Sequence, residues 1–344
     1  MRYGSEINPG NRFERIRTDL DPQLEGPANN RQIEYLDDES KTIVATNNSP
    51  DVPFNFSVNL YRGCIHGCSY CYALPTHEYL GLNAGLDFET KIVVKRNAAT
   101  LLRSFLARKS WQPEPIAFSG VTDCYQPAER HFKLTRQCLQ VALEARQPVG
   151  IVTKNALIER DVDILSEMAA LKLIHAHLSV TTLEPELARV MEPRTSIPAA
   201  RLRSIETLAN QGIPVGVMVA PIIPGLNDNE IPAILKAAKD AGATAAGQIL
   251  LRLPLTVAPV FEEWLKRCQP LKADRIIGRI RQTRGGQIND ADFGQRMTGS
   301  GEIADQIQSM LSLFKRRLDL DQPLPDYDCS QFRRPAEAEQ PWLF

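Results

Sequence analysis

Short apolar runs alternate with longer amphipathic stretches between residue 51 and about residue 255. Each run is short enough to be a strand that is buried on both faces. The six runs are Phe56–Leu60, Pro115–Ser119, Val149–Thr153, Ile174–Val180, Val215–Ala220 and Gly247–Leu251. The stretches with helical periodicity are Ala98–Arg108, Leu134–Ala145, Arg160–Leu171, Pro198–Gln211 and Glu230–Ala241. This repeated pattern predicts an α/β fold with a parallel sheet, because parallel neighbours need crossover connections.

Six strand–helix units leave two architectures open. A curled sheet would form a partial (β/α)6 barrel of the TIM type with one side open, and a flat sheet would be doubly wound. In both, ligands bind at the carboxyl ends of the strands. Polar residues follow the strands there: Thr122-Asp123, Thr153-Lys154-Asn155, Ser179-Val180-Thr181-Thr182 and Arg252. Loop starts and helix caps would also account for any one of them.

The flanks of this core differ from it. Residues 1–50 are rich in Asn, Asp, Arg, Glu, Pro and Gly without sustained periodicity, which predicts an irregular N-terminal arm. Residues 51–255 form the predicted core. Residues 256–344 form a C-terminal extension with an extended tail after three expected helices, Val260–Cys268, Ala273–Arg284 and Glu302–Leu318.

Basic residues gather in one part of the extension. The span Lys266–Arg284 has seven basic residues against the single acid Asp274. It is a solvated helix surface or a phosphate-binding surface for nucleic acid, and its lack of aromatic residues favours the former.

Composition and charge narrow the class of protein. The formal net charge of −1 gives no global attraction to nucleic acid or to an anionic membrane. Four of the seven cysteines stand apart, which is unlike a disulfide framework and favours a reducing, cytoplasmic compartment. The polar stretch Met1–Asp21 predicts no signal peptide, and the longest apolar stretch, Ile213–Ile223, is too short to span a membrane.

The other three cysteines, Cys64, Cys68 and Cys71, lie within eight residues, directly after the first apolar run. Their spacing lets three thiolates converge on one soft metal centre. A structural zinc site would want a fourth ligand, for which His77 is the local candidate. A [4Fe–4S] cluster held by three thiolates would instead leave one iron open for catalysis.

The Cys-x3-Cys-x2-Cys spacing, with Tyr70 before the third cysteine and a strand–helix array after it, resembles the radical S-adenosylmethionine (radical SAM) superfamily. The resemblance covers roughly residues 54–255 and implies the partial barrel. It also implies a [4Fe–4S] cluster and SAM as cofactors, and an electron donor such as flavodoxin or ferredoxin. In this family the reduced cluster cleaves SAM, and the resulting 5′-deoxyadenosyl radical abstracts hydrogen from a substrate.

Within the superfamily the chain is similar to the spore photoproduct lyase-like branch, including bacterial members of unknown substrate. The similarity rests on Asn11–Glu14, on Thr122–Pro127 and on Phe332–Pro335. This branch weakly favours nucleic acid as the substrate, and a protein or peptide side chain is the second candidate. A non-catalytic iron–sulfur or zinc module that binds nucleic acid is the alternative outside enzymes.

The resemblance implies a role for each matching residue. Cys64, Cys68 and Cys71 would hold the cluster, Thr122 and Asp123 would meet the SAM amine, and Lys154 would meet its carboxylate. Further contacts are implied for Ser179 and Thr181 at the ribose, Glu192 and Arg194 in a closing loop, and Ile223 and the backbone at Tyr70 beside the adenine.

One position departs from the lyase. Where that enzyme has a hydrogen-donating cysteine, this chain has Gly120, which counts against lyase activity on thymine dimers. Cys124, four residues further on, is the candidate hydrogen donor.

Overall fold

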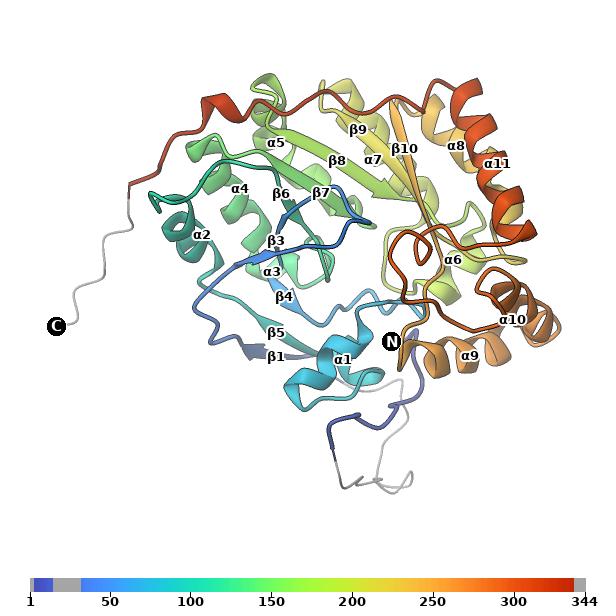
Figure 1. The fold of residues 1–344 in the computed structure, drawn as a ribbon. Helices are drawn as coiled ribbons and strands as arrows, with labels where there is room; N and C mark the ends of the chain where they lie inside the picture. The colour runs from blue at the N-terminus through green and yellow to red at the C-terminus, as the bar shows by residue number, and fades with distance from the viewer. Residues whose placement is uncertain (1–2, 15–31, 337–344) are drawn as a thin grey trace.

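A curved sheet of seven strands forms the centre of the protein. The computed structural model describes residues 3–14 and 32–336. The strand order is β10-β9-β8-β7-β6-β3-β2 (Figure 1). Its six parallel strands are β3 (Phe56–Val58), β6 (Ile116–Phe118), β7 (Val149–Thr153), β8 (Ile174–Ser179), β9 (Val215–Ile222) and β10 (Ala245–Leu250). All six predicted runs are therefore strands.

The strand order separates the two predicted architectures. In a doubly wound sheet the order reverses at a switch point. Here the six parallel strands follow one another in chain order from β3 to β10, as in a (β/α) barrel. No pairing joins the edge strands β2 and β10 in the part of the chain that the structure describes, so the barrel is partial, as predicted.

Apolar residues alternate with more polar ones along the strands. One face of the sheet is therefore apolar, and the helices pack on this outer face. On β8, Ile174, Ala176 and Leu178 are fully buried, whereas His175 and His177 on the opposite face are not. The buried set packs in the main hydrophobic core with apolar residues of the connecting helices. These helices are α2 (Ala98–Leu106), α4 (Leu134–Ala145), α5 (Val162–Ala170), α7 (Pro198–Asn210) and α8 (Ile231–Asp240).

Residues 32–50 contain two strands where we expected irregular structure. β1 (Glu34–Asp37) pairs with β5 (Lys91–Val94), and β2 (Val44–Thr46) pairs with β3. β4 (Tyr61–Arg62) completes the smaller sheet β1-β5-β4. These strands are too short to show a period in the sequence, and pairing with distant segments forms them. Residues 1–2 and 15–31 of the predicted arm lie outside the described residues.

The open side of the barrel is bridged near the carboxyl ends of its strands. Asp51, in the loop after β2, accepts a hydrogen bond from the Gly294 N–H (2.7 Å) and forms an ion pair with Arg296. In the loop that contains Gly294 and Arg296, the Met297 carbonyl accepts a hydrogen bond from the Leu250 N–H at the end of β10 (2.8 Å). The loop that holds residues 294–297 therefore contacts both edges of the opening.

The C-terminal extension contains α9 (Val257–Cys268), α10 (Ala273–Gln282) and α11 (Glu302–Arg317). Its tail crosses the amino ends of β7 and β8, where the Tyr327 hydroxyl donates to the Val149 carbonyl (3.3 Å) and its ring stacks on His175. The shorter helices are η2 (Leu74–Leu80), α1 (Leu86–Thr90), α3 (Glu129–Phe132), η3 (Ala156–Asp161), α6 (Pro185–Met191), η4 (Asp228–Glu230) and η5 (Cys329–Gln331).

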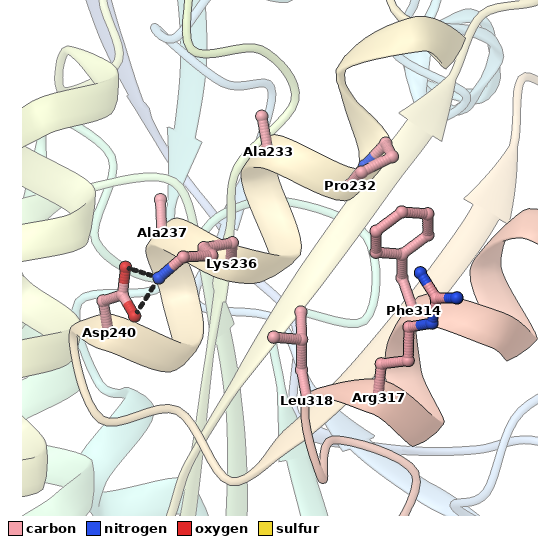
Figure 2. A pocket seen from close by; sticks show the side chains of 8 residues that line it. All are labelled: Pro232, Ala233, Lys236, Ala237, Asp240, Phe314, Arg317 and Leu318. Atoms are coloured by element: carbon pink, nitrogen blue, oxygen red, sulfur yellow. Dashed lines mark hydrogen bonds and ion pairs between the residues drawn. The ribbon is translucent and has the colours of Figure 1, made fainter.

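A groove of about 500 Å³ lies between α8 and α11 (Figure 2). Phe314, Leu318 and two alanines supply most of its apolar lining, and Lys236 and Asp240 form an ion pair at its edge. None of its lining residues belongs to the segments that carry the predicted site. Among the described helices, none is long and apolar enough to cross a bilayer.

Candidate active site

The three cysteines lie on one loop between β4 and η2. All are free thiols; Cys64 is buried, and Cys68 and Cys71 are partly buried. After burial, the charge of Asp123 raises the pKa of Cys64 and the charge of Glu192 raises the pKa of Cys68, and neighbouring thiols of the loop add to both effects. Burial is the largest effect on each thiol, and it raises the pKa of Cys71 to about 11.

Backbone hydrogen bonds from three segments fix this loop. The Cys64 N–H donates to the Phe88 carbonyl of α1 (2.8 Å), and the Ser69 N–H donates to the Met191 carbonyl at the end of α6 (3.1 Å). Gln126 binds the loop twice: its side-chain oxygen accepts from the Ile65 N–H (2.9 Å), and its amide donates to the Gly63 carbonyl (3.1 Å). The thiols are therefore held in place by the protein around them.

A buried ion pair clamps the tip of the loop. The Arg194 guanidinium donates to the Ile65 carbonyl and pairs with the Glu89 carboxylate. Glu89 also accepts hydrogen bonds from the N–H groups of Gly4 (3.2 Å) and Ser5 (2.7 Å), which ties the N-terminal segment to the loop. Gly67 has a φ of +64°, and a Cβ there would lie 2.4 Å from the carboxylate of Glu89.

Both histidines near the loop have partners other than the thiols. His66 is buried; its Nδ1 lies 3.4 Å from a carboxylate oxygen of Asp123, and its Nε2 lies 3.1 Å from the Asn155 amide nitrogen. His77, the candidate fourth zinc ligand, has its Nε2 2.9 Å from the Lys91 carbonyl and its ring edge-on to Phe88.

The donor set fits a [4Fe–4S] cluster. Three soft thiols from one tight loop can bind three different irons, which leaves the fourth iron without a protein ligand. Among the described residues, no three His, Cys, Asp or Glu side chains are arranged to hold a single metal ion.

Glu192 is the centre of a buried network beside the loop. One of its oxygens accepts hydrogen bonds from the Tyr70 and Thr181 hydroxyls, and the other pairs with Arg201. Burial by itself would raise the pKa of Glu192, but Arg201, Lys154 and the two hydroxyls lower it to about 2. The carboxylate is thus ionised and fully occupied by protein donors at neutral pH.

Lys154 connects this network to the cysteines. Its ammonium donates to the Ala220 carbonyl (3.0 Å), lies 3.8 Å from a Glu192 oxygen and lies 5.9 Å from the centre of the Tyr70 ring. Its charge also lowers the pKa of the thiols of Cys68 and Cys71, against the larger effect of burial. A partly exposed cation therefore stands next to the predicted cluster.

Asp123 and Thr122 have protein partners instead of open space. One Asp123 oxygen accepts hydrogen bonds from the Thr153 hydroxyl (2.7 Å) and the Tyr125 N–H (2.8 Å), and the other accepts from the Lys154 N–H (2.8 Å). The Thr122 hydroxyl donates to the Tyr61 carbonyl (2.9 Å). These side chains join the end of β6 to β7 and to the cysteine loop.

The remaining predicted residues differ in their surroundings. Ser179 and Thr181 are buried at the end of β8, and Ile223 is buried in the same hydrophobic cluster as Cys64 and Tyr70. Cys124 is buried in the main core instead, where burial raises the pKa of its thiol. Its surroundings give no support to the hydrogen-donor role.

Sequence reasoning missed three residues that hold the site: Glu89, Gln126 and Arg201. Gln126 lies within the Thr122–Pro127 segment, so the resemblance gave a signal for it, but nothing in the local sequence distinguishes Glu89 or Arg201. Arg201 is on α7, where its 1% exposure is unusual for an arginine.

The basic span Lys266–Arg284 lies on α9, α10 and the turns beside them. Arg267 pairs with Glu263 and Glu6, and Arg284 is buried. The others are exposed: Lys266, Lys272, Arg275, Arg279 and Arg281. Both helices contribute apolar residues to the hydrophobic cluster that contains Cys64, and these five basic residues lie on their solvent-exposed side.

Comparisons with known proteins agree with this geometry. The fold is a partial (β/α) barrel with three cysteine thiols on one loop. The sequence profile of the Radical SAM superfamily matches residues 58–238. The chain therefore belongs to the radical SAM superfamily, which confirms the resemblance drawn from Cys64–Cys71.

The chain is also similar to uncharacterized relatives in sequence and to solved structures in fold. Uncharacterized protein Rv2578c of Mycobacterium tuberculosis is 38% identical over 237 residues, 68% of each chain. Uncharacterized protein MJ0683 of Methanocaldococcus jannaschii is 30% identical over 201 residues, 58% of this chain and 72% of that one. Spore photoproduct lyase complexed with dinucleoside spore photoproduct has a TM-score of 0.57 at 13% identity, over 83% of this chain and 79% of that one. A variant of this lyase reaches a TM-score of 0.61 at 13% identity, over 85% and 80%.

The chain is accordingly a radical SAM enzyme whose cofactors are a [4Fe–4S] cluster and SAM. This assignment favours catalysis over the non-catalytic binding module that the sequence left open.

Proposed function

We propose that this radical SAM enzyme removes a hydrogen atom from a nucleic acid. The observation that carries the proposal is the exposed basic surface of α9 and α10, two helices whose apolar residues pack in one hydrophobic cluster with Cys64 and Tyr70. Lys and Arg side chains that neutralise phosphates supply most of the sequence-independent affinity for nucleic acid. The similar fold of a lyase that is complexed with a dinucleoside photoproduct supports the same substrate class.

The cofactor contacts are part of the proposal. Cys64, Cys68 and Cys71 hold the [4Fe–4S] cluster, which supplies the electron for cleavage of SAM when it is bound. Lys154 binds the SAM carboxylate through a charge-assisted contact, since its side chain is partly exposed and, among the described residues, its ammonium donates only to the neutral Ala220 carbonyl. Four further residues line the SAM site: Tyr70, Ser179, Thr181 and Ile223.

Four residues expected to contact SAM are better explained as positioning residues. The polar atoms of these side chains form hydrogen bonds or ion pairs with other protein groups; the four residues are Thr122, Asp123, Glu192 and Arg194. Asp123 orients the backbone at Lys154, Glu192 orients its ammonium, and Arg194 holds the cysteine loop. A flavodoxin or ferredoxin is the proposed electron donor.

Isotope transfer tests the substrate class. The anaerobically reconstituted protein is mixed with dithionite, SAM and either deuterated oligonucleotides or deuterated peptides. We expect deuterium in 5′-deoxyadenosine with DNA or RNA and none with peptides. Transfer from the peptides alone would replace nucleic acid with a protein substrate, and transfer from neither would contradict both.

A further inference from the structure

Arg252 stands at the carboxyl ends of the strands, beside the cysteine loop. Its backbone is fixed on both sides: the Leu251 N–H donates to the Ile222 carbonyl (2.9 Å), and the Leu253 N–H donates to the Asn289 side chain (3.1 Å). Its guanidinium lies 5.9 Å from the ring centre of Tyr72, the residue directly after Cys71.

Tyr72 connects Arg252 to the loop after β6. It is 46% exposed, and its hydroxyl donates to the Gly120 carbonyl just beyond β6 (2.7 Å). Arg252, Tyr72 and Gly120 thus come from β10, the cysteine loop and β6, at the end of the barrel where ligands bind.

The guanidinium of Arg252 forms no ion pair in the part of the chain that the structure describes, although the charge of Asp51 acts on it from a greater distance. Its Nε is buried and makes no hydrogen bond, and its Nη1 has only the Met297 sulfur, a weak acceptor, at 3.8 Å. A buried donor without an acceptor is costly, and a guanidinium is usually buried only when it is paired.

Two further arginines add positive charge. Arg296 forms an ion pair with Asp51, but its positive charge still lowers the pKa of Arg252, and this effect is second in size to that of burial. Arg284 is 3% exposed; its terminal nitrogens donate to main-chain carbonyls, and its buried Nε has no partner among the described residues. The charge of Arg252 contributes to lowering the pKa of Arg284, again after burial.

We propose that Arg252 binds a phosphate group of the substrate at the mouth of the barrel, next to Tyr72. Two guanidiniums that form no ion pair among the described residues match the charge of a phosphate, and the fork of N–H donors on arginine matches its oxygens. The assignment rests on the proposed function, because it places one phosphate of that substrate beside the site of SAM cleavage. A nucleic-acid phosphodiester and a free phosphorylated molecule offer the same chemistry.

Binding measured without reductant tests this site independently of SAM cleavage. The full-length reconstituted protein is titrated into a short fluorescent single-stranded DNA at several salt concentrations. We expect Arg252→Gln to weaken binding about tenfold and to reduce the salt slope by about one. Arg252→Lys should recover part of the affinity, since it keeps the charge. Arg203→Gln, an exposed arginine on α7, is the matched control and should bind as the wild type does.

Inorganic pyrophosphate distinguishes the two sources of the phosphate. Displacement of the DNA by pyrophosphate in the wild type, but not in Arg252→Gln, identifies a site for a free phosphate group. An Arg252-dependent affinity for DNA that pyrophosphate does not affect identifies a phosphodiester in a chain. Equal binding by Arg252→Gln and the wild type, with the cluster absorption of both intact, overturns the inference. Failure of the wild type to bind either probe overturns it as well, even if the protein cleaves SAM.

Discussion

Gly67 offers a sharp test of the clamp on the cysteine loop. Its φ of +64° is left-handed, and a Cβ would lie 2.4 Å from a Glu89 carboxylate oxygen and 2.6 Å from an Arg194 nitrogen. Gly81 is a matched control, because its φ of +70° is similar but nothing lies within 4 Å of its Cβ position. Alanine at either position bears the same backbone strain, and only Gly67→Ala collides with the buried ion pair.

The expected difference follows from these contacts. A non-glycine residue in the left-handed region costs roughly 1–2 kcal/mol, and this cost cancels between the two variants. Removal of one partner of a buried ion pair costs about 3–5 kcal/mol, which bounds the cost of displacing the pair. We therefore expect Gly67→Ala to lower the free energy of unfolding by up to about 3 kcal/mol more than Gly81→Ala, which is at most roughly a hundredfold in the equilibrium constant.

Two measurements check this expectation. Denaturant unfolding of the cluster-free proteins gives the stability difference, and iron analysis after reconstitution gives the cluster content. Gly67→Ala should also retain less iron, because the displaced clamp holds the segment between Cys64 and Cys68. Equal stability and equal iron content in the two variants would refute the role of the Glu89–Arg194 pair.

Three further predictions concern the surroundings of the site. Lys154→Met should weaken SAM binding by about 10- to 100-fold in equilibrium dialysis, since a hydrogen bond to a charged group contributes ~1.5–3 kcal/mol; unchanged affinity would remove Lys154 from the SAM site. Arg201→Met should lower the free energy of unfolding by about 3–5 kcal/mol in denaturant unfolding, against under ~0.5 kcal/mol for the exposed Arg203→Met. Adding Glu192→Leu to Arg201→Met should recover part of this loss, and additive losses would contradict the pairing. Burial lowers the pKa of His177 from 6.5 to about 4, so the unfolded chain gains a proton first as the pH falls. Stability should drop by up to about 3 kcal/mol from this group between pH 6.5 and 4, and a His177→Gln variant with the same pH dependence would contradict it.

The sequence predicted the parts of the fold that repeat. The runs that became β7 and β8 are visible because one face of each strand is fully buried, and helices with a clear period follow them. β2 and β4 have three and two residues, which is too short for any period, and they form only through pairing with β3 and β5.

The cysteine ligands were predictable because they are close in sequence, whereas the groups around them were not. Asp123 follows a strand and was expected to face SAM, but the fold brings Thr153, Lys154 and His66 to its two oxygens. Glu89 contacts Arg194 across 105 residues of chain. Such partners depend on tertiary packing, so a strand-end position identifies the region of a site and not the contact that each side chain makes.

The central claim is that the loop Cys64–Cys71 holds a cluster that cleaves SAM. Its most direct test is the amount of 5′-deoxyadenosine formed anaerobically from SAM and dithionite by the reconstituted protein. We expect the product with the wild type, and neither product nor the visible absorption of the cluster with Cys64→Ala, Cys68→Ala or Cys71→Ala. A wild-type protein that carries a full cluster and forms no 5′-deoxyadenosine would contradict the account.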